Sequence, residues 1–145
     1  MFEKLFMLVK SNAGTAVIDN PVIPVKYHEA VINEASSSII EVLKNQLETG
    51  KIKELIKFFQ FSGIYNNTLV SSIINMFANK LNNFYGIEPD SAMYTANTLI
   101  TPVMAELVKE SKDEKNMDFG LSNFLSKLNG NQADMSHLVD QMMVA

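Results

Sequence analysis

The sequence predicts an all-α protein, a compact bundle of about six to seven helices with an extended, proline-containing strap near the N-terminus. Apolar residues recur at helical spacing in successive segments, and no segment keeps the alternating pattern of a strand. Glycines and prolines stand at the ends of these segments, where they stop or begin helices. With 145 residues, 47% of them apolar, the chain is about one ordinary domain, so we expect a single domain over residues 1–145.

The N-terminal part is expected to contain a short helix and then the strap. Residues 2–9 place apolar side chains at helical spacing, and Gly14 is a natural stop for this helix. Residues 14–26 are rich in valine and isoleucine, but Pro21 and Pro24 exclude a helix interior and remove donors from any strand ladder. We therefore interpret this segment as an extended apolar strap.

Three helices and a tight corner are predicted next. Residues 27–48 form an amphipathic helix that ends at a glycine, and residues 51–59 form a shorter one before a loop. A third helix begins near Asn66 or Asn67, which are good cap residues, and Gly86 is its expected left-handed stop. Pro89 suits the first turn of the following helix, so local chemistry alone explains the corner.

The C-terminal part is expected to hold a long helix and two short ones. The apolar face of the long helix continues through Pro102, which predicts a kink at about residues 98–101. The charged residues 109–116 are read as a helix end and loop, and a short helix then stops at Gly130. The last helix is expected to dock on its own domain or on a neighbouring molecule, because residues 131–145 carry an apolar stripe: Met135, Leu138, Val139, Met142 and Met143.

Composition argues against nucleic-acid binding. The chain has a formal net charge of -4, and all of its basic groups are lysines, so the bidentate arginine fork for phosphates and guanine is missing. If the helix after the corner were a recognition helix, Glu88 and Asp90 would repel phosphates. Its exposed N-terminal positions would be Asp90, Ser91, Tyr94, Thr95 and Asn97. We expect no nucleic-acid partner.

The absence of cysteine excludes a disulfide framework, a thiolate nucleophile and cysteine-ligated metal. The longest apolar run near the N-terminus, residues 5–9, is shorter than the core of a secretory signal. No stretch approaches the roughly 20 apolar residues of a membrane span. A cytoplasmic location without a membrane span is the resulting expectation.

No catalytic signature stands in the sequence. His28 and Glu29 begin like a zinc-protease motif, but Ile32 occupies the place of its second histidine. His137 has Asp134 and Asp140 one turn away on either side, which is read as a solvated face rather than a metal site. The heptad-spaced Glu34, Glu41 and Glu48 are likewise read as a solvated face. We therefore assign no catalytic, cofactor-binding or metal-binding residue.

Three segments carry a family resemblance: DNPVIPVKYHEAVINEASSSIIEVLKNQLETG, KLNNFYGIEPDSAMYTANTLITPVMAELV and FGLSNFLSKLNG. They resemble the bacterial YidB-like family of helical proteins, particularly longer members with an N-P-x-x-P strap, over roughly residues 17–130. The resemblance implies an all-α fold and a family without an assigned biochemical function. It carries over no functional residue.

The functional expectation is a non-catalytic protein-protein interaction or scaffold module, with a protein partner or self-association. A helical pocket for an apolar small molecule or lipid is the alternative, and DNA binding or catalysis ranks behind both. The strap is apolar, and methionine-rich surfaces adapt to varied partners. The residues proposed for an interaction surface are Phe58, Phe59, Phe61, Met135, Leu138 and Met142.

Overall fold

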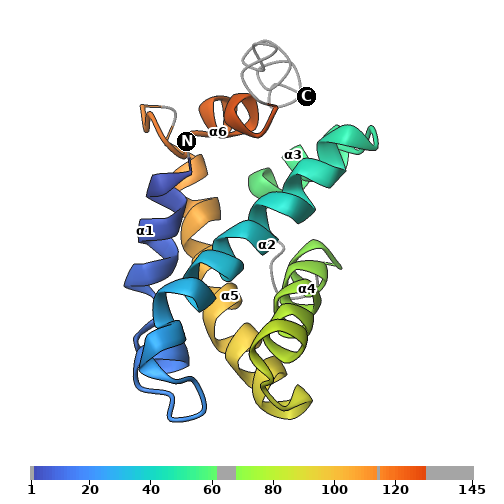
Figure 1. The fold of residues 1–145 in the computed structure, drawn as a ribbon. Helices are drawn as coiled ribbons and strands as arrows, with labels where there is room; N and C mark the ends of the chain where they lie inside the picture. Colours follow the sequence, from blue (N-terminus) through green and yellow to red (C-terminus); the bar gives the residue numbers. More distant parts are fainter. Residues whose placement is uncertain (1, 62–67, 114, 130–145) are drawn as a thin grey trace. The chain divides into compact units, whose positions relative to one another are not determined.

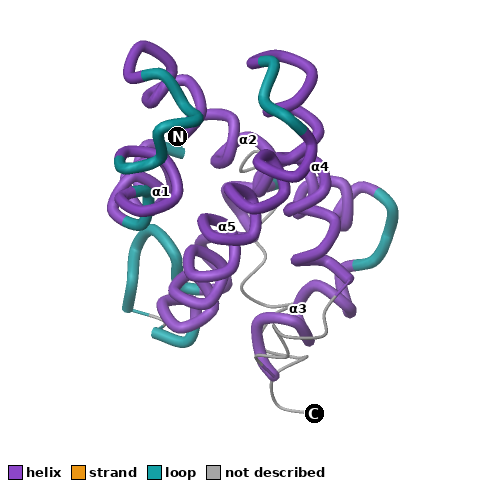
Figure 2. Tube along the Cα trace, turned by 90° about the horizontal axis from the view of Figure 1, so that it is seen from below, coloured by secondary structure: helices purple, strands orange, loops and turns teal. Residues whose placement is uncertain are grey.

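A computed structural model of the chain describes residues 2–61, 68–113 and 115–129, and every regular element in these residues is helical (Figures 1 and 2). The predicted all-α class is confirmed. The elements are α1 (Glu3–Ser11), a π-helical turn (Gly14–Ile18), a 3-10 turn (Val25–Tyr27), α2 (His28–Glu48), α3 (Ile52–Phe61), α4 (Thr68–Tyr85), α5 (Pro89–Ser111) and α6 (Leu121–Leu128).

The chain falls into two compact units. The first unit comprises Met1–Ile39 and Thr68–Met104, and the second comprises Ile40–Asn67 and Ala105–Ala145. Two helices, α2 and α5, contribute residues to both units. The single domain expected from chain length stays a prediction.

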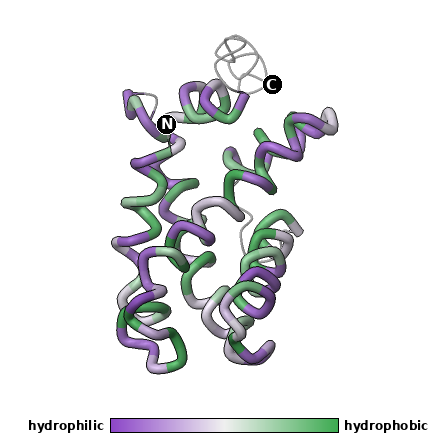
Figure 3. The backbone as a smooth tube through the Cα atoms, viewed as in Figure 1, coloured by the Kyte–Doolittle hydropathy of each residue, from purple (hydrophilic) through white to green (hydrophobic). Residues whose placement is uncertain are grey.

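The first unit is held together by the apolar faces of α1, α4 and the first parts of α2 and α5. Figure 3 shows apolar and polar residues alternating along these helices, as amphipathic packing requires. Burying one large apolar side chain contributes about 1.5–3 kcal/mol, so this core is the main stabilising term. Its fully buried residues include Val9, Ala16, Val17, Val31, Ile39, Ile73, Phe77, Leu81, Ala96 and Leu99.

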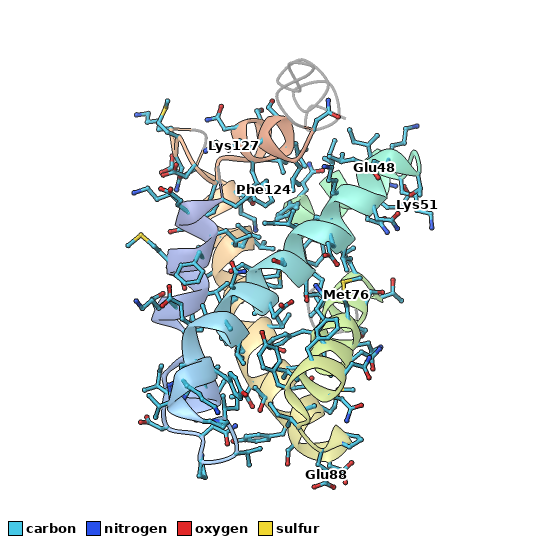
Figure 4. All side chains as sticks on the ribbon, in the orientation of Figure 1. Glu48, Lys51, Met76, Glu88, Phe124 and Lys127 are labelled. Carbon is cyan, nitrogen blue, oxygen red and sulfur yellow. The ribbon has the colours of Figure 1, made fainter. Side chains whose placement is uncertain are left out.

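The second unit is centred on a cluster of aromatic rings. Phe59 of α3 meets Phe124 of α6 edge-on, with ring centroids 6.0 Å apart, and Phe58 and Phe119 extend the cluster on either side. The Oδ1 atom of Asn116 accepts hydrogen bonds from two backbone N–H groups just before α6. Figure 4 shows Phe124 and Lys127 on this helix.

The strap is a series of turns and not an extended segment, which corrects the prediction. The amides of Ile18 and Asp19 donate to carbonyls five residues earlier, at 3.0 and 2.8 Å, and so close a π-helical turn. A further turn follows, closed by the 3.1 Å bond from the Ile23 amide to the Asn20 carbonyl. The two prolines exclude helix where they stand, but they do not prevent the preceding residues from winding into a turn.

The corner between α4 and α5 has the predicted local chemistry. Gly86 has φ = +65°, a left-handed conformation that favours glycine, and Pro89 is the first residue of α5. The helix continues through Pro102 as expected, and the kink at residues 98–101 stays a prediction. No helix among the described residues is long and apolar enough to cross a membrane. The predicted C-terminal helix of residues 131–145 lies outside the described residues.

Candidate functional site

Exposed apolar side chains concentrate at one place in the first unit. Among the described residues, eight large apolar side chains are exposed, and six of them lie on the strap or at the α4–α5 corner. The exposed fraction reaches 82% for Val25 and 68% for Phe84. We call this set the strap-corner surface: Ile18, Val22, Val25, Phe84, Met93 and Tyr94.

Two contacts join the strap to the corner. The side-chain amide of Asn20 donates to the Thr95 hydroxyl at 3.1 Å, which ties the strap to the start of α5. The rings of Tyr27 and Tyr85 meet edge-on with centroids 5.5 Å apart, which ties the 3-10 turn to the end of α4. The two segments therefore lie together, at the lower end of the first unit in Figure 1.

Asn20 uses its whole side-chain amide to shape the strap. Its Nδ2 atom donates to the Ala16 carbonyl at 3.0 Å as well as to Thr95, and its Oδ1 atom accepts from the Val22 amide at 3.1 Å. Asparagine suits this position because its short side chain bonds readily to nearby backbone. These bonds hold the strap in the conformation that leaves Ile18 and Val22 exposed.

The strap encloses a shallow, open recess of about 280 Å³. His28 lies at its edge, and its Nε2 atom is 3.0 Å from the Ile23 carbonyl. A carbonyl oxygen only accepts, so Nε2 carries the hydrogen and Nδ1 is an acceptor in the neutral ring. The residues that line the recess are Ile18, Asp19, Asn20, Pro21, Ile23, Pro24, Val25 and His28.

The charges around the strap-corner surface are mostly negative. Residues 18–29 and 84–94 contain four carboxylates against one lysine, a net charge of -3, and all five groups are exposed. The ammonium of the lysine, Lys26, lies over the Tyr27 ring, 5.0 Å from its centroid. Figure 4 shows Glu88 directed away from the helices at the corner. The four carboxylates belong to Asp19, Glu29, Glu88 and Asp90.

A polar group behind the corner links α2 to α4. The phenol of Tyr85 lies near the Glu34 carboxylate, which is 3.7 Å from the Lys80 ammonium. Burial raises the pKa of Tyr85 above its ordinary value of 10.0, and the charge and hydrogen bond of Glu34 raise it further. The phenol therefore stays protonated at neutral pH.

Within the described part of the second unit, the carboxyl group of Glu110 lies in an unfavourable environment. The Oε2 atom of Glu110 is shielded from solvent and has no hydrogen-bond partner, although the residue as a whole is partly exposed. Burial raises the pKa of Glu110 above its ordinary value of 4.5, and the charges of Glu106 and Asp118 raise it further. Among the described residues, no group of three or more histidines and carboxylates is arranged to hold a metal ion.

Of the residues proposed from the sequence for an interaction surface, the structure describes the side chains of Phe58 and Phe59. Phe58 and Phe59 are 4% and 1% exposed, so they belong to the core of the second unit and not to a surface. Their rings pack against each other and against α6, which gives them partners within the chain. The structure does not describe the Phe61 side chain, and Met135, Leu138, Met142 and the His137 group lie outside the described residues.

Two of the residues that a recognition helix would use to contact bases, Thr95 and Asn97, have partners within the chain. Thr95 was expected to be exposed, but it is completely buried and its hydroxyl accepts from Asn20. Asn97 is exposed, but its side chain donates back to the Met93 carbonyl within α5. The remaining positions keep the acidic surroundings that disfavour phosphates.

Sequence reasoning recognised the apolar strap but missed Phe84 and Met93. The apolar spacing alone would place Phe84 on the inward face of α4, three residues after the buried Leu81. In the structure Tyr85 takes the inward position, four residues after Leu81, because it meets Tyr27 and Glu34. The sequence gives one indication of this outcome: Phe84 and Tyr85 are adjacent at a helix end, and two adjacent side chains cannot both face inward.

Comparison with protein-family models, curated protein sequences and solved structures finds no match to this chain. The resemblance to the YidB-like family stays a prediction, and the functional argument rests on the geometry of the strap-corner surface.

Proposed function

We propose that this protein is a non-catalytic interaction module that binds a partner protein through the strap-corner surface. The observation that carries the proposal concerns the described residues: six of their eight exposed large apolar side chains lie on two segments that contact each other. Exposed apolar patches with polar rims are typical of interaction sites, whereas single exposed apolar residues need no explanation.

The charges favour a partner of particular chemistry. The net charge of -3 over residues 18–29 and 84–94 would attract a segment that carries lysine or arginine beside its apolar residues. A second copy of the chain would bring the same negative charges together, and an anionic membrane would be repelled. The partner that fits is therefore a protein segment with apolar side chains flanked by basic ones.

The recess offers less support for the alternative, a site for a small apolar ligand or lipid. Its volume of about 280 Å³ lies just below the roughly 300–1,000 Å³ of ordinary ligand sites, and it is open to solvent. A recess of this size suits one side chain of a partner better than a whole lipid. Native mass spectrometry of the purified protein would detect a retained lipid and so favour the alternative.

The proposal can be tested by selecting binders from a random-peptide display library against the full chain. Each selected peptide is then measured against the double variant Val25→Ser/Phe84→Ser, which makes the two most exposed apolar positions of the surface polar. Met117→Ser is the matched control, because Met117 is 76% exposed but lies in the second unit.

We expect peptides whose affinity falls at least tenfold in the double variant and is unchanged in the control, a difference of about 1.4 kcal/mol or more. Circular dichroism of each variant checks that the helices are retained. Failure to select any peptide, or peptides that bind the double variant as well as the original chain, would refute the proposal.

A further inference from the structure

The recess of the strap combines apolar walls with a single negative charge. Ile18, Ile23 and Val25 supply aliphatic surface, and the two prolines of the strap add to it. Asp19 is the one carboxylate among the lining residues, and its carboxylate forms no hydrogen bond or ion pair within the part of the chain that the structure describes. This combination differs from a purely apolar pocket, since an apolar occupant would leave Asp19 partly desolvated and without a partner.

Among the residues that the structure describes, no lysine lines the recess. Lys26 is the nearest lysine in sequence, but its ammonium lies over the Tyr27 ring and the residue is absent from the lining. The Nε2 atom of His28 is engaged by the Ile23 carbonyl at 3.0 Å, so that N–H is not free to bind an anionic group. The polar groups at the recess are therefore suited to a donor that carries positive charge.

We infer that the recess binds one lysine or arginine side chain of the partner, with its aliphatic stem against the apolar walls and its charged end at Asp19. This inference rests on the proposed function and adds the identity of the anchoring residue. Lysine and arginine bury their methylene stems along apolar surface while the charged end stays near water or a carboxylate. The open, shallow shape of the recess allows that arrangement, because the charge need not be fully desolvated.

The test is a double-mutant cycle between the chain and a peptide chosen by the display selection. In the peptide, each lysine or arginine is replaced in turn by norleucine, which keeps an aliphatic stem and removes the charge. In the chain, Asp19→Asn removes the carboxylate charge. Glu29→Gln is the matched control, because Glu29 is an exposed carboxylate in the same segment that does not line the recess.

We expect one lysine or arginine whose replacement weakens binding to the original chain by about two- to fivefold, the range for partly exposed charge pairs. The same replacement should have no effect on binding to Asp19→Asn, whereas it should weaken binding to Glu29→Gln as in the original chain. That coupling would locate the basic side chain at Asp19.

Two other outcomes are distinguishable. Peptides that depend on Val25 and Phe84 but contain no basic residue coupled to Asp19 would overturn this inference and leave the proposed function intact. Peptides that do not depend on Val25 and Phe84 would refute both.

Discussion

Asn20 and Thr95 lie 75 residues apart in the sequence, and the side-chain amide of one donates to the hydroxyl of the other at 3.1 Å. Thr95 is completely buried, so its hydroxyl depends on a partner within the protein. The bond attaches the strap to α5 and so brings Ile18 and Val22 to the same end of the unit as Tyr94.

The change Asn20→Ala should therefore destabilise the first unit. It removes three hydrogen bonds and leaves the buried Thr95 hydroxyl without a donor, so we expect a loss of about 2 kcal/mol in the free energy of unfolding. Urea unfolding followed by circular dichroism measures this loss. Asn97→Ala is the control, because Asn97 is exposed and makes one bond within its own helix. An equal effect of the two changes would show that the strap is not attached through Asn20.

The all-α class and most helix ends were predictable because they depend on local chemistry. Apolar periodicity marks each helix, and glycine and proline mark its ends. The bond between Asn20 and Thr95 was not predictable, since nothing near either residue indicates the other. The same reason explains the strap: its prolines exclude an α-helix, but the turns it adopts are set by contacts with α5 and α4.

Gly86→Ala should destabilise the corner. Gly86 has φ = +65°, where an added Cβ costs about 1–2 kcal/mol because of its clash with the backbone, although the surrounding space is open. Thermal unfolding of the variant should show a lower Tm. Gly14→Ala is the control, since Gly14 has no positive φ and equal space around it. If both glycines tolerated alanine equally, the left-handed corner would not be a constraint on the fold.

Tyr85 should lose its proton only above pH 10.0 in the folded protein. Its pKa is raised by burial first and then by Glu34, so the folded state keeps the phenol proton above pH 10.0, where the unfolded chain releases it. The stability that this phenol contributes is present below pH 10.0 and is lost as the pH rises through the folded-state pKa. Absorbance of tyrosinate at alkaline pH, compared between the original chain and Tyr85→Phe, measures the difference. The absorbance change that is lost in Tyr85→Phe belongs to Tyr85. If that change occurs at or below pH 10.0, it contradicts the effects of burial and of Glu34 on this phenol.

Glu110→Gln should stabilise the protein at neutral pH. Because burial and neighbouring carboxylates raise the pKa of Glu110 in the folded state, the ionised carboxylate is less favourable there than in the unfolded chain. Stability is therefore lost as the pH rises from 4.5 through the folded-state pKa, and glutamine avoids this loss. We expect a higher Tm for the variant at pH 7 and a difference that shrinks below pH 4.5. Glu54→Gln, an exposed change on α3, should have little effect at either pH.

The candidate site was predictable only in part. The apolar strap was recognisable in the sequence. A cluster of aromatic residues in the sequence, however, does not show whether those residues form a surface or a core. Phe59 packs against Phe124 of α6 and Phe58 packs against Phe59, whereas at the end of α4 Tyr85 and not Phe84 takes the inward position. These outcomes depend on which helix lies opposite, and the periodicity of one helix carries no information about its neighbour.

The most direct test of the proposed function is a backbone NMR titration of the full chain with a peptide from the display selection. Chemical-shift changes report where the peptide binds without any substitution in the protein. We predict that the largest changes fall within residues 18–28 and 84–95, the strap and the corner. Largest changes in α3 or α6, with the strap and the corner unaffected, would contradict the account.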